Sequence, residues 1–300
     1  MTRIARPWLP ALAAISILLP ACASGPGAST GPIDHPAGDA LVLRIEYSGG
    51  FVAPGFRYTS FPLFSLAGDG RVILPGAQDA IFPGPALPAA NVRRLTDAGI
   101  QAVLDAVAGT ALFGASIEYR GAQNCVADAS DTIFTLHAAG REVQVLVYGL
   151  GTLDPGGHCP GIAAAEMAAQ RTLQDLSGRL ANLEAWLPVT AWAEPTWRPY
   201  QPSALRLLVR NADGDQPDPS GIANQLLDWP DGSDPASFGD PIALGDQHCG
   251  VVSGQPAQAW YAALSHANQL TRFVKDGHRY EVTVRFQLPD EPLACPKLAA

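Results

Sequence analysis

The sequence predicts an α+β protein made of two sheet-plus-helix halves, in which antiparallel hairpins are covered by one packed helix each. Three observations support this prediction. Short segments alternate apolar and polar residues at the spacing of strands, and longer segments carry apolar residues at the spacing of helices. Four cysteines also fall within the body of the chain, which predicts two disulfides.

The N-terminal segment has the layout of an export signal. Arg3 and Arg6 form a basic start, and residues 8–19 are mostly apolar but too few to span a bilayer comfortably. This run ends in Leu19-Pro20-Ala21-Cys22, which resembles the lipobox of bacterial lipoproteins. The resemblance covers residues 1–22. It implies that the signal peptide, residues 1–21, is removed and that Cys22 receives a diacylglyceryl group on its thiol.

Such a lipid group would tie the protein to a membrane, because each buried methylene contributes about 0.8 kcal/mol. The resemblance therefore implies a protein anchored at the cell membrane or outer envelope, with its body outside the cytoplasm and the membrane as its first partner. An ordinary secretory signal followed by a chance cysteine is the alternative. Residues 22–39 are rich in Gly, Pro, Ser and Ala, and this composition predicts a disordered tether.

The charge of the chain excludes some classes of partner. The net charge is -9, with 19 basic residues against 28 acidic ones. This balance argues against nucleic acid or an anionic lipid surface as the main partner, because both require a basic face.

The cysteine count agrees with export. Once Cys22 is set aside for lipidation, Cys125, Cys159, Cys249 and Cys295 remain, an even number that favours two disulfides in an oxidising compartment. Three pairings are open. Proximity in the sequence favours Cys125 with Cys159 and Cys249 with Cys295, so that each bridge lies within one half.

The first half is expected to span residues 40–187. Strands are predicted at 41–47, 63–66, 71–74, 132–137 and 142–148, because apolar and polar residues alternate there and glycine-containing turns join the last two pairs. A helix is predicted from Val92 to Val107 with Asn91 as its N-cap. A second helix is predicted from Ala163 to Leu187, packed on its own domain rather than forming a coiled coil.

The second half is expected to span residues 188–300, after a stretch rich in proline and tryptophan. Residues 205–209 predict a strand, and residues 256–270 predict a helix with Trp260 on its apolar face. The clearest strand covers residues 280–288 and follows the hairpin turn Asp276-Gly277. Strand, long loop, helix and hairpin occur in the same order in both halves, which raises the hypothesis of a duplication.

No motif predicts a metal site, a cofactor or a catalytic centre, and none of the three is assigned. His158-Cys159 and His248-Cys249 could ligate zinc or copper, but adjacent ligands lack the usual spacing and disulfides would consume the thiols. Residues 211–218 begin like a calcium loop without its glycine and glutamate, so a solvated turn is favoured. Local signatures of a nucleophile, such as Gly-x-Ser-x-Gly or His-Glu-x-x-His, do not occur.

Tryptophans in proline-rich loops offer the remaining candidate site. Trp192, Trp197 and Trp229 could contact an envelope protein or a glycan, because flat rings bury a large area at small entropic cost. The sequence therefore predicts a non-catalytic binding or scaffolding protein at the cell envelope. The alternatives are an envelope hydrolase with a non-local active site and an inhibitor of a secreted protein.

Overall fold

The computed structural model describes residues 31–53, 55–153, 159–242 and 246–297. The predicted signal peptide and Cys22 lie outside these described residues. Residues 33–300 form one compact unit, which includes the end of the predicted tether. Gln101 accepts a hydrogen bond from the Ile33 N–H at 2.8 Å, and the Asp34 carbonyl accepts one from the Ala139 N–H at 2.7 Å. These residues are therefore bound to the body rather than disordered.

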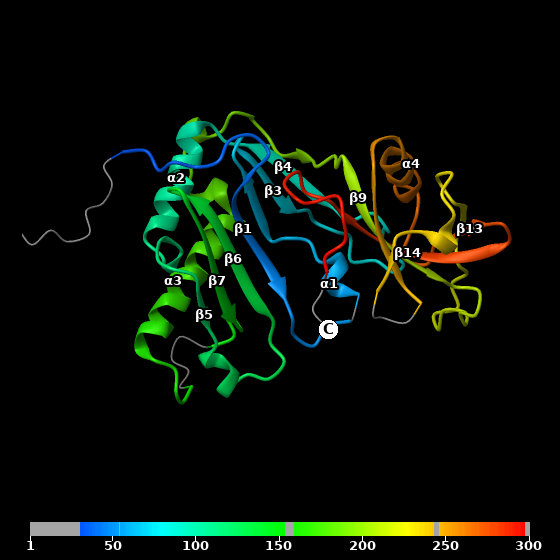
Figure 1. Ribbon diagram of the computed structural model, residues 1–300, viewed down its shortest axis with the longest axis horizontal. Helices are drawn as coiled ribbons and strands as arrows, with labels where there is room; N and C mark the ends of the chain where they lie inside the picture. Colours follow the sequence, from blue (N-terminus) through cyan, green and yellow to red (C-terminus); the bar gives the residue numbers. More distant parts are fainter. Residues whose placement is uncertain (1–30, 54, 154–158, 243–245, 298–300) are drawn as a thin grey trace, which may run out of the picture. The chain divides into compact units, whose positions relative to one another are not determined.

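The first sheet has eight strands in the order β5-β7-β6-β1-β2-β3-β4-β8 (Figure 1). Its strands are β1 (Leu41–Ser48), β2 (Phe64–Ala67), β3 (Arg71–Pro75), β4 (Ala90–Arg94), β5 (Ile117–Tyr119), β6 (Asp131–Ala138), β7 (Arg141–Tyr148) and β8 (Arg198–Pro199). The β6–β7 turn has Ala139 and Gly140 at positive φ, as a tight two-residue hairpin requires.

The two helices predicted in the first half both pack on this sheet, so this half has more than the one packed helix of the predicted fold class. They are α2 (Asp97–Ala108) and α3 (Ala164–Ala181), and their buried faces join the same cluster as Leu43, Ile45 and Phe134 of the sheet. The second helix ends earlier than expected, because a short 3-10 turn at Leu183–Ala185 follows Ala181.

The first predicted helix is present, but its predicted start at Val92 with Asn91 as N-cap was wrong. Residues 90–94 form β4, which pairs with β3 on one side and with β8 on the other. The helix starts at Asp97, where the side chain of Thr96 accepts a hydrogen bond from the Gly99 N–H at 3.2 Å. Val92 fitted the apolar face of a helix, but its burial comes from strand pairing and from packing in the core of the second sheet.

The second sheet has six strands in the order β10-β13-β14-β9-β12-β11. They are β9 (Ala204–Asn211), β10 (Leu226–Asp228), β11 (Asp240–Pro241), β12 (His248–Ser253), β13 (Arg272–Lys275) and β14 (His278–Phe286). The helix α4 (Gly254–Leu264) packs on it through Trp260 and Leu264. The four-residue helix α1 (Phe56–Thr59) lies against β9 and β14.

The fold class is α+β, as predicted, but both sheets are mixed rather than purely antiparallel. A short edge strand pairs in parallel in each: β5 with β7, and β10 with β13. The hairpins are also placed differently. The first strand of the β6–β7 hairpin pairs with β1, whereas the second strand of the β13–β14 hairpin pairs with β9. The two halves therefore differ in the order of their strands, and only the first half ends in a helix, α3.

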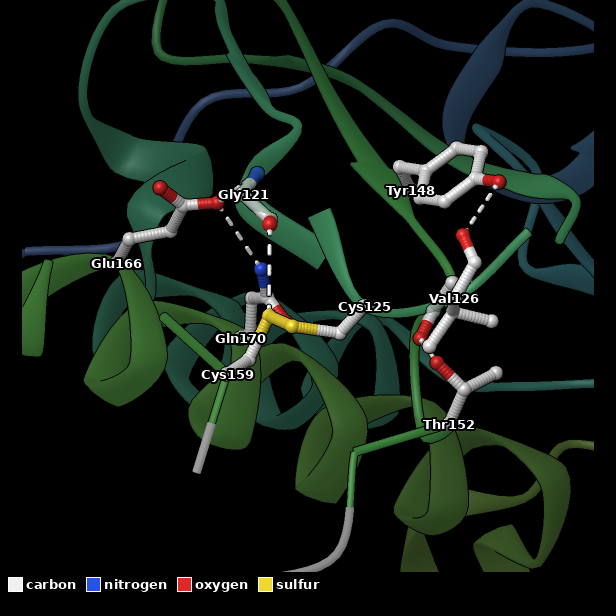
Figure 2. The surroundings of a disulfide bond; sticks show 9 residues. Gly121, Cys125, Val126, Tyr148, Thr152, Cys159, Glu166 and Gln170 are labelled. Atoms are coloured by element: carbon white, nitrogen blue, oxygen red, sulfur yellow. Dashed lines mark hydrogen bonds between the residues drawn. A yellow bond between two sulfur atoms is a disulfide. The ribbon is translucent and has the colours of Figure 1, made fainter. Parts of the chain in front are cut away.

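Two disulfides join Cys125 to Cys159 and Cys249 to Cys295, the pairing that proximity in the sequence favours. Figure 2 shows the first bridge beside Glu166, which accepts hydrogen bonds from the Gly121 N–H at 2.8 Å and from Gln170 at 3.1 Å. This bridge connects the loop after β5 to the residues that precede α3. The second bridge ties β12 to the residues that follow β14.

Candidate ligand-binding cleft

Three strands have an apolar face in a core and an arginine on the opposite face. On β1, Arg44 alternates with Leu43 and Ile45, which belong to the core under α2 and α3. On β9 and β14, Arg206 and Arg285 likewise alternate with residues of the core under α4. The arginine faces of β1, β9 and β14 contribute to one cleft.

This cleft has a volume of about 350 Å³, and residues of α1 and of the chain after β14 line it together with residues of the strands. Figure 1 shows α1 and the end of the chain near β1. Its charged lining residues are Arg44, Glu46, Arg57, Arg206, Arg285 and Glu291. Its apolar lining includes Phe56, Ile133, Pro292 and Pro296. The volume is at the lower end of the range for small-molecule sites.

One wall of the cleft is the C-terminal segment, defined here as residues 287–296. Glu291 holds Arg285 with two hydrogen bonds of 2.6 and 2.7 Å, and it accepts a third from the Leu288 N–H. Asp290 lies 2.6 Å from Arg44. Burial alone would raise the pKa of Glu291, but hydrogen bonds and charge from Arg285 outweigh it and hold that pKa below its ordinary value.

Arg206 on β9 also lines the cleft, but it has no carboxylate partner among the described residues. Its residue is 8% exposed, yet no carboxylate among the described residues lies within ion-pair distance of its guanidinium. One Nη donates to the Tyr58 carbonyl at 3.2 Å, and the buried Nε has no acceptor in the described part of the chain. Burial, together with the nearby charge of Arg285, lowers the pKa of Arg206 to about 10.

Glu46 is the one acid of the cleft for which the structure shows no ion pair within the described residues. Burial raises the pKa of Glu46 above its ordinary value of 4.5, and the charges of Glu291 and Asp290 act in the same direction. Arg44 and Arg285 oppose this effect but do not overcome it. The cleft therefore combines an arginine that lacks a counter-charge with a carboxyl group that is costly to ionise.

Comparison with protein-family models, with curated proteins and with solved structures finds no match to this chain. The function of the cleft therefore rests on the chemistry of its own residues. Guanidinium groups in a partly enclosed, partly apolar cleft are suited to binding a small anion.

Trp229 is buried in the core of the second sheet, whereas contact with a ligand requires an accessible ring. The residue is 7% exposed, and its ring packs edge-on against Trp260, Phe238 and Tyr280 in the core of the second sheet. Asp231 accepts hydrogen bonds from the indole N–H groups of both Trp229 and Trp260, at 3.0 and 2.8 Å. The ring and the polar atom of Trp229 therefore have their partners inside the fold, and the residue offers little surface for the ligand contact that its loop position had suggested.

Trp192 and Trp197 form a separate pair on the first sheet. Their ring centroids lie 5.7 Å apart, and the guanidinium of Arg93 stacks 3.8 Å from the centroid of Trp192. Trp197 lines a pocket of about 170 Å³ with Asn91, Glu184 and other residues. Both rings are half-buried, so their predicted contact with a ligand stays a prediction.

The described histidines have no hydroxyl or thiol group hydrogen-bonded to them. His278 lies 2.7 Å from Asp213 at the β13–β14 turn, and hydrogen bonds from His278 and the Arg279 N–H lower the pKa of Asp213 to about 2. His158 lies outside the described residues. Within the described part of the chain, no three His, Cys, Asp or Glu side chains gather as metal ligands would. None of the described helices has the length and apolar character needed to cross a membrane.

Arg44, Arg206 and Arg285 were not predicted from the sequence as residues of a site. In β1 and β14 the charged residues alternate with apolar ones, which is the pattern of a strand with one solvent-exposed face. Arg206 gave the one usable signal, because it interrupts the apolar run of residues 204–209. An arginine inside such a run indicates a strand whose two faces are both covered.

Proposed function

We propose that this protein is a lipid-anchored, exported envelope protein that binds a small ligand in the cleft between β1, β9 and β14, without catalysing a reaction. The observation that carries the proposal is Arg206, a guanidinium that lines the cleft with no carboxylate partner among the described residues. A buried charge without a counter-charge is costly to the fold, and a bound anion would offset that cost.

The envelope location is supported by different features. Leu19-Pro20-Ala21-Cys22 resembles a lipobox, and the remaining four cysteines are used in two disulfides, as an oxidising compartment favours. A lipid at Cys22 would hold the body close to the membrane, where a binding protein meets the small molecules, glycans or proteins of the envelope.

Photo-crosslinking in intact cells tests whether a ligand binds in the cleft. A photoreactive amino acid replaces Phe56, which lines the cleft, and in a control protein it replaces Val189, which is 82% exposed elsewhere. We expect an adduct of constant added mass on the Phe56 protein and none on the control. Equal adducts at both positions would contradict ligand binding in the cleft.

The same cells test the anchor when they are separated into membrane and soluble fractions. The protein with Cys22 intact should be in the membrane fraction and should incorporate a labelled fatty acid. Cys22→Ala should lose the label and either leave the membrane fraction or retain its signal peptide. Normal processing with unchanged membrane retention in Cys22→Ala would contradict lipid anchoring.

A further inference from the structure

The ion pairs of the cleft leave one buried guanidinium without a carboxylate. Of its four guanidinium groups, that of Arg44 is paired with Asp290 and that of Arg285 with Glu291. Arg57 is exposed, so water screens its charge. Arg206 has no ion pair among the described residues, and neither has Glu46, whose burial disfavours the ionised form. The buried part of the cleft therefore contains a guanidinium charge that no ion pair neutralises.

The hydrogen-bonding capacity of Arg206 is also unfilled. A guanidinium carries five N–H donors, and the structure gives Arg206 one acceptor, the Tyr58 carbonyl. Carboxylates and phosphates present two oxygens at the spacing of a guanidinium edge, so one such group can accept two hydrogen bonds at once. A chloride ion or a water molecule offers a single acceptor atom and cannot form these two parallel hydrogen bonds.

Apolar side chains line the same cleft as the guanidinium of Arg206. Phe56 from α1, Ile133 from β6 and Pro292 and Pro296 from the C-terminal segment line the same cleft. A free inorganic anion would leave these groups in contact with water, whereas an organic body attached to the anion would cover them. The volume of about 350 Å³ suits a small molecule rather than a peptide segment.

We propose that the ligand of the cleft is a small organic acid, with a carboxylate or phosphate group on the guanidinium of Arg206 and an apolar body against Phe56, Ile133 and Pro292. This inference rests on the proposed function, because it takes the cleft to be the ligand site. It adds the chemical class of the ligand and the residue that selects it.

Calorimetric titration of the full-length protein with four probes tests the ligand class. Benzoate and phenyl phosphate combine an oxyanion with a ring and distinguish the two anion types, benzamide keeps the ring without charge, and inorganic phosphate keeps the charge without a ring. We expect at least one of the two acids to bind with a Kd in the millimolar range that is usual for ligands of this size. Benzamide and inorganic phosphate should bind at least about tenfold more weakly.

Two outcomes would overturn the inference, and they have different meanings. If benzamide binds as tightly as benzoate, the cleft remains a binding site but does not select an anion. If neither acid shows saturable binding, the inference fails, while crosslinking at Phe56 still reports independently on ligand binding in the cleft.

Substitution of Arg206 tests the selecting residue. Arg206→Met should weaken binding of the acids by more than about tenfold, because charge-assisted hydrogen bonds to the anion are lost. Its melting temperature should stay within about 4 °C of the parent protein, because no ion pair is removed. A merely structural arginine would show the reverse, a large loss of stability with unchanged binding.

The matched control is Arg198→Gln, which removes the same charge from an exposed position on β8 that pairs with Glu194. It should leave binding of the acids unchanged within about twofold, because a surface charge of this kind is screened. If Arg206→Met does not fold, Arg206→Lys replaces it, keeping the charge but not the planar edge, and should still weaken binding. Full affinity in a folded Arg206→Met or Arg206→Lys protein would overturn the assignment.

Discussion

Glu46 lines the cleft, and its burial there disfavours the ionised form of its carboxyl group. The charged groups that act on it come from three strands and the C-terminal segment: Arg44 on β1, Arg206 on β9, Arg285 on β14, and Asp290 and Glu291. Because the pKa of Glu46 is raised, folding favours its protonated form. Its contribution to stability is therefore full below pH 4.5 and is lost as the pH rises through the raised pKa.

Glu291 behaves in the opposite way. Its pKa is lowered, so its contribution to stability is present above pH 4.5 and is lost as the pH falls through the lowered value. As the pH falls from neutral, Glu46 takes up a proton first, while Glu291 stays ionised and keeps Arg285 paired. The charge of the cleft then changes at Glu46 alone.

This order of protonation predicts how pH changes anion binding. Affinity for benzenesulfonate, an anion whose charge is constant over this range, should rise as the pH falls toward the raised pKa of Glu46. Glu46→Gln should bind this anion roughly tenfold more tightly at neutral pH, since about 1.4 kcal/mol of charge repulsion is removed, and should lose the pH dependence. Calorimetric titration at several pH values measures both effects. Weaker binding by Glu46→Gln would show that Glu46 supports the ligand instead of repelling it.

At the scale of single residues, the sequence predicted the disulfide cysteines better than the residues of the site. The cysteine pairs followed from proximity, because each pair brackets a local stretch of chain. Trp229 was misjudged, because nothing local reveals that Asp231 and Trp260 enclose its ring. Arg206 was missed because its surroundings come from α1 and β14, far away in the sequence.

The C-terminal segment is the element on which the shape of the cleft depends. Apart from its ion pairs with Arg44 and Arg285, it is held by a hydrogen bond of 3.0 Å from the Gln287 N–H to the Ala204 carbonyl and by the disulfide between Cys249 and Cys295. The disulfide fixes the far end of the segment to β12. The wall that carries Glu291 and Pro292 is therefore fastened at both ends.

Removal of each disulfide in turn separates stability from binding. Replacing Cys249 and Cys295 by serine should destabilise the protein by roughly 2–5 kcal/mol and weaken benzoate binding, because the wall of the cleft is released. Replacing Cys125 and Cys159 by serine should have a similar effect on stability and little on binding, since that bridge lies beside α3. Denaturant unfolding and calorimetry measure the two effects. Equal loss of binding in both proteins would mean that the C-terminal segment has no special role.

Elements were predicted well where local signals are strong. The β13–β14 turn was anticipated from Asp276-Gly277, and both residues have positive φ. The strand β4 was mistaken for the start of a helix, because its apolar residues also fit a helical face and its pairing partners β3 and β8 are distant in sequence. The parallel edge strands β5 and β10 were missed, because each has only three residues.

At the scale of the whole molecule, the cleft has the opposite charge character to the chain. The net charge is -9, yet four guanidinium groups gather at one place between two sheets. The helices α2, α3 and α4 cover the outer apolar faces, so the polar faces of β1, β9 and β14 are free to form a site. Composition could not predict this, because the arginines come from three separate strands.

A crystal structure of the protein soaked with 4-iodobenzoate tests most directly whether the cleft binds an organic acid, because the iodine atom can be located by its anomalous scattering. We expect the iodine in the cleft beside Phe56 or Pro292, with the carboxylate within hydrogen-bond distance of the guanidinium of Arg206. Iodine bound beside Trp197, or elsewhere outside an empty cleft, would contradict the proposed site.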